Sequence, residues 1–223
     1  MASFQAFFED HAAASLEKQL ALADLIGEAG WQLDLALGTI SFGATLSFPV
    51  QILGSESQYS NTWLWAWANT QSNLPAAQVQ AARRIRDLGL REHIDEFTEA
   101  SVSLEQLTGH QIALVATGII GADAYYRGPY AGGAIFVLLE APIVRQHVDG
   151  STLHLIKVFN QLISLFPMDH RRALKAYLRH RRYTPVETAV GIEAVGVDGA
   201  VIRASFDSHG RLVKLTTSTG HPH

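Results

Sequence analysis

Three polar residues with alternating spacing, Asp123, Tyr125 and Arg127, form the first candidate ligand site. On a β-strand this spacing places all three side chains on one face. A carboxylate, a phenol and a guanidinium together offer acceptors, a hydroxyl and a fork of donors. Such a set suits a ligand with a carboxylate or phosphate, which Arg127 would bind through paired charge-assisted hydrogen bonds. The alternative is a structural Asp–Arg pair beside the turn at Gly128-Pro129, because surface ion pairs are common and weak.

The segment 62–69 (TWLWAWAN) carries three of the four tryptophans at alternate positions, Trp63, Trp65 and Trp67. As a strand it would present the three rings on one face and small residues on the other. Two apolar faces predict a central antiparallel strand. The rings are either core, because large aromatics dominate core packing, or the apolar wall of a ligand pocket next to Asp123, Tyr125 and Arg127.

A strongly basic segment spans residues 169–182 and is the second candidate site. It holds six of the 17 basic residues against one acid: Arg171, Arg172, Lys175, Arg179, Arg181 and Arg182. The net charge of the chain is -4, so this helix is a candidate patch for an anion or an acidic protein partner. The alternative is a solvated helix face, with the late arginines favoured by the helix C-terminus.

Several kinds of chemistry have no sequence signal. The chain has no cysteine, which excludes disulfides, thiol catalysis and zinc–thiolate sites. No phosphate-binding glycine loop and no nucleophile elbow are present. The ten histidines show no ligand spacing, so we expect neither a metal nor another cofactor. An acid–base site assembled from scattered residues stays open.

The composition indicates a cytoplasmic globular protein. The hydrophobic fraction of 48% supplies a packed core, and the charged fraction of 17% is below the usual value of about 25%, which leaves room for a homo-oligomer contact. The nearly balanced charge predicts no specific attraction to nucleic acid or to a membrane. The N-terminus does not resemble a signal peptide, and no apolar run reaches a membrane span.

The elements that would position these residues alternate between helical and strand periodicity. Helices are expected at 3–26, 75–94 and, in succession, 151–182, with strands between 31 and 69, a hairpin at 122–140 and further strands after 184. Residues 108–120 fit either a helix or a buried strand. The order predicts an α+β fold, with antiparallel sheets of short meander strands packed against amphipathic helices.

We expect one domain over residues 1–223, with a loop between two halves at 141–150 and a C-terminal β extension at 184–223. A chain of 223 residues is within the range of single domains. The 141–150 segment separates the hairpin from the paired helices.

Four strings resemble a bacterial family known only as a domain of unknown function. They are Leu16–Leu20, the TWLWAWAN segment, Gly121–Tyr130 (GADAYYRGPY) and Asp169–Leu174. The likeness extends over about residues 4–182. It implies a bacterial cytosolic protein and assigns no activity, ligand or site residue.

Three functional hypotheses follow from the residues. The first is a binding module for a small molecule or a partner protein, built on the tryptophans with Asp123, Tyr125 and Arg127. The second is an enzyme with a scattered, metal-free acid–base site. The third is an interaction protein that uses the basic helix on an acidic partner.

Overall fold

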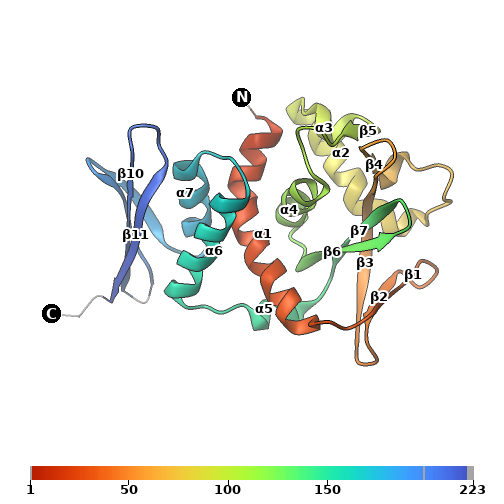
Figure 1. Cartoon of the computed structure of the whole chain (residues 1–223), viewed down its shortest axis with the longest axis horizontal. Helices are drawn as coiled ribbons and strands as arrows, with labels where there is room; N and C mark the ends of the chain where they lie inside the picture. Colours follow the sequence, from red (N-terminus) through yellow and green to blue (C-terminus); the bar gives the residue numbers. More distant parts are fainter. Residues whose placement is uncertain (1, 198, 220–223) are drawn as a thin grey trace. The chain divides into compact units, whose positions relative to one another are not determined.

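The computed structural model describes residues 2–197 and 199–219 and has the predicted α+β architecture. Contacts within the chain divide it into two compact units (Figure 1). Unit 1 comprises the residues up to Phe4 together with Lys18–Val148, and unit 2 comprises Gln5–Glu17 together with Asp149 onward. Helix α1 (Phe4–Ile26) therefore supplies residues to both units.

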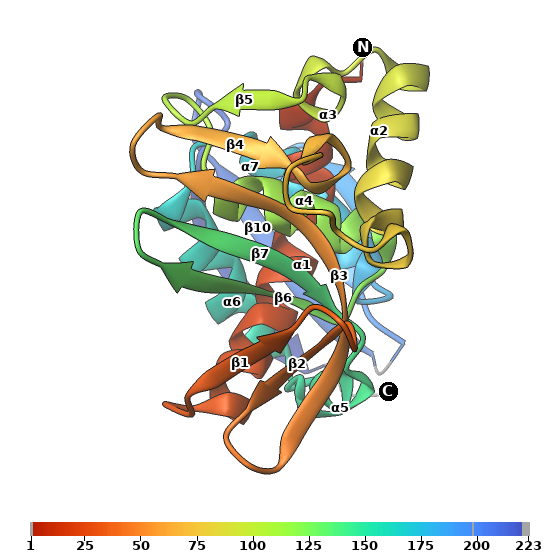
Figure 2. The ribbon, with the colours of Figure 1, turned by 90° about the vertical axis from the view of Figure 1, so that its right-hand side faces the viewer.

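Unit 1 is built on a seven-stranded antiparallel sheet in the order β1-β2-β3-β4-β5, with β7 also paired to β3 and β6 paired to β7 (Figure 2). The twelve-residue β3 pairs with β2, β4 and β7 along its length. The strands are β1 (Trp31–Asp34), β2 (Thr39–Phe42), β3 (Leu46–Ser57), β4 (Thr62–Trp65), β5 (Ser101–Ser103), β6 (Ala124–Tyr130) and β7 (Gly133–Leu139).

Helix α4 (Gly109–Ile120) resolves the ambiguous segment 108–120 as a helix. Thr108 caps its N-terminus in a reciprocal capping box with Gln111. The capping box satisfies backbone N–H groups at the start of the helix, which have no partner within the helix itself. The other helical elements of unit 1 are the 3₁₀ turns η1 (Ala66–Ala68) and η2 (Ala76–Val79), with α2 (Gln80–Glu92), α3 (Asp95–Thr98) and α5 (Pro142–His147).

The tryptophan segment is central but shorter than predicted. Strand β4 lies between β3 and β5, which confirms an antiparallel, non-edge position for Thr62–Trp65. The chain then turns into η1, so Trp67 does not lie on the strand. The prediction of three rings on one strand face is therefore wrong. The ladder between β3 and β4 ends at the Gly54–Trp65 pair, next to the register shift of β3 against β7 between Ile52 and Gly54.

Unit 2 contains two long helices and a second antiparallel sheet in the order β11-β10-β9-β8. The N-terminal stretch 5–17 is anchored by Glu9, which accepts a hydrogen bond from the Asp169 amide at 2.9 Å. The elements are α6 (Thr152–Leu165), α7 (His170–His180), β8 (Thr184–Thr188), β9 (Gly191–Val195), β10 (Ala200–Phe206) and β11 (Leu212–Thr219). The sheet corresponds to the predicted C-terminal β extension.

The segment 141–150, expected as a loop between two halves, contains the short helix α5. Pro142 occupies its first turn, where the missing amide proton costs nothing. The boundary between the two compact units lies at Val148 and Asp149, within this segment.

Candidate functional site at the two ends of helix α4

The string Gly121–Tyr130 supplies residues to two different places. Tyr125 and Arg127 share one face of β6. The register from β6 through β7 and β3 to β4 puts Trp63 and Trp65 on the same face of the sheet. Asp123 precedes the strand and pairs with Arg145 instead. The structure therefore separates the three polar residues that the sequence predicted as one set.

Trp63 and Trp65 form an aromatic layer that is core. Both are fully buried, and their rings meet edge to face at 5.5 Å. Trp63 also contacts Phe136 at 5.1 Å between ring centroids, and Trp65 Nε1 donates to the Glu96 carbonyl at 2.9 Å. Because no ring surface of either residue faces solvent, they do not form the wall of an open pocket. Trp67 is half-buried beneath the Arg86 guanidinium, 4.5 Å from the ring centroid.

Beside this layer, at the start of α4, lies a group of four polar residues that we call the His110 cluster: Glu56, His110, Tyr125 and Arg127. Arg127 donates from Nε to Glu56 Oε1 at 2.8 Å and again from Nη2. The Tyr125 hydroxyl is 2.7 Å from His110 Nδ1. The His110 ring lies edge to face on Phe136 at 5.7 Å, so the aromatic core supports the cluster from below.

Burial fixes the protonation of this pair. It raises the pKa of Tyr125 far above its usual range, and it lowers the pKa of His110, with the Arg127 charge acting in the same direction and Glu56 opposing it. Both groups are therefore neutral at pH 7. The phenol and Nδ1 share one hydrogen bond, and the imidazole tautomer determines which of the two is the donor.

Gly109 permits the close approach of these groups. A Cβ at this position would lie 2.7 Å from the Phe136 ring and 2.8 Å from Glu56 Oε2. The Glu56 carboxylate therefore reaches the first turn of α4, where the helix dipole favours an anion. Arg127 is already neutralised by Glu56, so no charge in the His110 cluster requires an external partner. The cluster therefore resembles a structural network with one partly exposed imidazole.

The opposite end of α4 borders a concavity of about 360 Å³, which we call the Asp123 groove. Asp123 is buried, and its Oδ2 accepts a hydrogen bond from the Ala141 amide at 2.7 Å. Its Oδ1 lies 2.9 Å from Arg145 Nε. The apolar walls of the groove come from α4, β7 and α5. Its polar lining consists of Gln51, Arg84, Asp123, Glu140 and Arg145.

Arg84 differs from Arg145 in having no counter-charge among the described residues. It is exposed on α2, lines the groove, and forms no ion pair or hydrogen bond with any of the described residues. Neither arginine is among the residues predicted from the sequence. No local signal connects them, because they are 61 positions apart and Arg145 lies in a segment that was expected to be a loop.

Comparison with known proteins bears on the same region. The model of one protein family matches residues 5–142, which is more than half of the chain. The chain belongs to this family, a family of unknown function (DUF6882). No curated protein and no solved structure matches the chain.

The DUF6882 match contains the whole His110 cluster and also Arg84 and Asp123, and it ends just before Arg145. It confirms the resemblance to a domain of unknown function. The likeness was expected to extend to residue 182, but the string Asp169–Leu174 lies beyond the matched range.

The basic helix lies outside the DUF6882 match, and four of its six basic side chains have a carboxylate partner within unit 2. Arg172 pairs with Asp10 at 2.6 Å, Arg181 pairs with the buried Glu17, and Arg171 and Lys175 share one acid, Glu187, at 3.0 and 2.9 Å. Arg179 and Arg182 are exposed, and the described residues provide no carboxylate for either. The free basic surface predicted there is thus smaller than the sequence count suggests.

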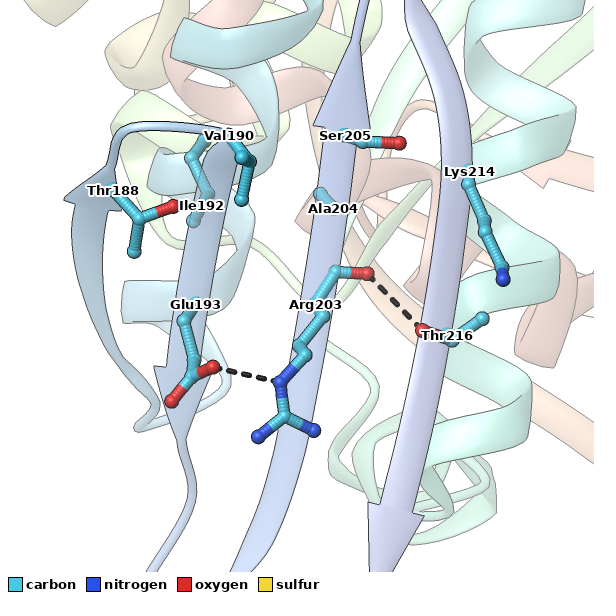
Figure 3. Close-up of a pocket in the computed structure, with 9 residues that line it drawn as sticks. All are labelled: Thr188, Val190, Ile192, Glu193, Arg203, Ala204, Ser205, Lys214 and Thr216. Atoms are coloured by element: carbon cyan, nitrogen blue, oxygen red, sulfur yellow. Dashed lines mark hydrogen bonds and ion pairs between the residues drawn. The ribbon is translucent and has the colours of Figure 1, made fainter.

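A shallower hollow of about 230 Å³ lies on the sheet of unit 2 (Figure 3). Arg203 reaches across it to Glu193 at 2.7 Å, and the Thr216 hydroxyl points to the Arg203 carbonyl. Its arginine is paired with Glu193, whereas the exposed Lys214 in its lining has no partner among the described residues. This hollow therefore offers one unpaired cation, without the second arginine that lines the Asp123 groove.

Among the described residues, no three His, Asp or Glu side chains come close enough together to hold a metal ion. Within the same residues, every helix is too short or too polar to cross a membrane.

Proposed function

We propose that unit 1 is a binding module for a small molecule that carries an anionic group, held in the Asp123 groove. The observation that carries the proposal is the meeting of Arg84, which has no described counter-charge, and Arg145 at one concavity of about 360 Å³. Ligand sites of this volume, with apolar walls and a few convergent polar groups, are the usual form for small molecules.

Asp123 acts in this proposal as a positioning residue for Arg145. Its carboxylate accepts a hydrogen bond from the Ala141 amide, and its Oδ1 lies 2.9 Å from Arg145 Nε. The side chain of Arg145 is 59% exposed, so its terminal nitrogens stay available to a carboxylate or phosphate. Holding the guanidinium in place lowers the conformational entropy lost when the ligand binds.

Glu140 would determine which way round a ligand lies in the groove. Its exposed carboxylate lies on the same rim as the two arginines. A second negative group on that side of a ligand would be repelled, whereas a hydroxyl or amine would find an acceptor. We therefore expect the anionic group to lie between Arg84 and Arg145, with a neutral part of the ligand toward Glu140.

Calorimetric titration with butyrate and inorganic phosphate tests this assignment. We expect the variants Arg84→Ala and Arg145→Ala each to lose about tenfold or more in affinity, since a charge-assisted bond contributes about 1.5–3 kcal/mol. Arg83→Ala is the matched control, because Arg83 is exposed on the same helix and does not line the groove. No binding by the wild type, or equal losses for all three variants, would contradict the proposal.

The second candidate function is an enzyme with a metal-free acid–base site at the His110 cluster. The specific observation in its favour is the 2.7 Å contact between Tyr125 and a neutral imidazole, because neutral histidine is the usual general acid or base near pH 7. NMR spectra recorded with the same probes separate the two candidates. Shifts of the His110 ring signals without shifts at Arg84 would favour the enzyme.

The third hypothesis is a basic helix that binds an acidic protein. Among the six basic side chains of that helix, Arg179 and Arg182 are those without a carboxylate among the described residues. Two such charges support weak, salt-sensitive association at most. The cytoplasmic location stays part of the proposal and is favoured by the absence of cysteine, which fits a reducing compartment.

A further inference from the structure

A second concavity, of about 300 Å³, continues the Asp123 groove along α2. The two share Arg84 and Ile120 as lining residues, so Arg84 stands where they join. We call the second one the Arg91 hollow. Its other walls come from Leu88, Ile119, Asp87 and Arg91, which gives it an apolar floor and charged sides.

Arg91, like Arg84, is an exposed arginine of α2 without a partner among the described residues. The two lie seven residues apart on α2, so they share a helix face and are separated by roughly 10 Å along the helix axis. Arg91 is exposed, and the described residues supply no carboxylate or hydrogen-bond acceptor for its guanidinium. Of the other arginines on this helix, Arg86 covers Trp67 and Arg83 lines neither concavity.

Asp87 lies between these two arginines in sequence and lines the same hollow. It stands three residues after Arg84 and four before Arg91, spacings at which helix side chains commonly pair. No ion pair forms between Asp87 and either arginine. The three charged side chains of α2 that line the hollow are therefore positive, negative and positive in sequence order, and all three are exposed.

We infer that the ligand of unit 1 is an elongated molecule with two separate anionic groups, one held by Arg145 and Arg84 and the other by Arg91, joined by a neutral spacer. This inference rests on the proposed function. The two joined concavities supply the length, and the apolar floor of Leu88, Ile119 and Ile120 suits an aliphatic spacer. Asp87 disfavours continuous negative charge and accepts a hydrogen bond from a hydroxyl on the spacer.

Titration calorimetry with linear dicarboxylates from succinate to sebacate, each compared with the monocarboxylate of equal chain length, tests the inference. In the wild type we expect the longer dicarboxylates to bind about tenfold or more tightly than their monocarboxylates, and succinate to show no such preference. Tripolyphosphate should bind more weakly than the preferred dicarboxylate, and Asp87→Asn should reduce that difference.

Variants distinguish this inference from the proposal beneath it. Arg91→Ala should remove the preference for long dicarboxylates and leave the affinity for monocarboxylates unchanged, whereas Arg145→Ala should weaken both, and Arg83→Ala neither. If Arg145→Ala weakens binding but Arg91→Ala leaves the preference intact, the proposed function stands and the two-anion ligand is wrong. If neither class of acid binds the wild type, both are wrong.

Discussion

Helix α4 begins beside one group of charged residues and ends beside another, and the two groups differ in how their charges are met. At its start, Arg127 is bound by Glu56 and His110 by Tyr125, so each polar group has a partner inside the protein. At its end, Arg84 and Arg91 line open concavities without counter-charges among the described residues.

The contrast teaches that one end of the helix carries charged groups that pair within the protein, while the residues proposed to bind a ligand lie at the other end. Removing a member of a paired, partly buried group leaves its partner unsatisfied, which destabilises the fold. Removing an exposed and unpaired arginine changes the free energy of unfolding by about 0.5 kcal/mol or less. All four tryptophans lie in unit 1, so tryptophan fluorescence during urea unfolding reports on both ends.

The largest effect should come from the aromatic layer under the His110 cluster. Trp65→Ala is expected to lower the free energy of unfolding by about 3–5 kcal/mol, because it leaves a cavity in a fully buried site and frees the Glu96 carbonyl. Urea unfolding of the variant measures this cost. A loss under about 1 kcal/mol would show that the layer is not the core of unit 1.

Glu56→Ala should have the next largest effect, about 2 kcal/mol. It strips Arg127 of its partner, although the 30% exposure of that side chain lets water replace part of the interaction. The double variant Glu56→Ala with Arg127→Ala should cost less than the sum of the two single variants. Additive costs would show that the ion pair contributes nothing and that the two ends of α4 do not differ as described.

Asp123→Ala should cost about 1–2 kcal/mol, since it leaves the buried Ala141 amide without its acceptor. The same variant should also weaken butyrate binding through the loss of Arg145 positioning. Arg84→Ala is the comparison, with weaker binding and no measurable change in unfolding. Asp123→Ala with wild-type affinity would limit Asp123 to a structural role.

The smallest effect should be a pH dependence from His110. Its pKa in the folded state is lowered, so the unfolded chain takes up a proton first as the pH falls below about 6.5. Its contribution to stability is complete above this pH and is lost as the pH falls toward the folded-state pKa. The loss between pH 7.5 and 5.5 should be smaller in His110→Gln than in the wild type. Equal losses in both proteins would contradict a neutral, desolvated imidazole.

Local patterns predicted most of the secondary structure. The long helical stripe of α1, the hairpin β6–β7, the paired helices α6 and α7 and the C-terminal strands are confirmed, because periodicity reports which face of an element is buried. The short helix α5 and the end of β4 were not predicted. Three to six residues are too few for a periodic signal, and β4 ends at Trp65 where the turn η1 begins, although the alternation of tryptophans continues to Trp67.

The sequence by itself determined that the chain is an α+β protein and that Tyr125 and Arg127 share a face, because alternation along a strand is a local property. Tertiary structure alone decided their partners. Glu56 and His110 come from distant segments, and the register of β3, β7 and β6 brings them to the same end of α4. It also decided that Arg84 has no carboxylate partner among the described residues, while Arg172 and Arg181 are neutralised. Whether an arginine forms an ion pair depends on which carboxylates the fold brings beside it, and no local sequence pattern predicts this.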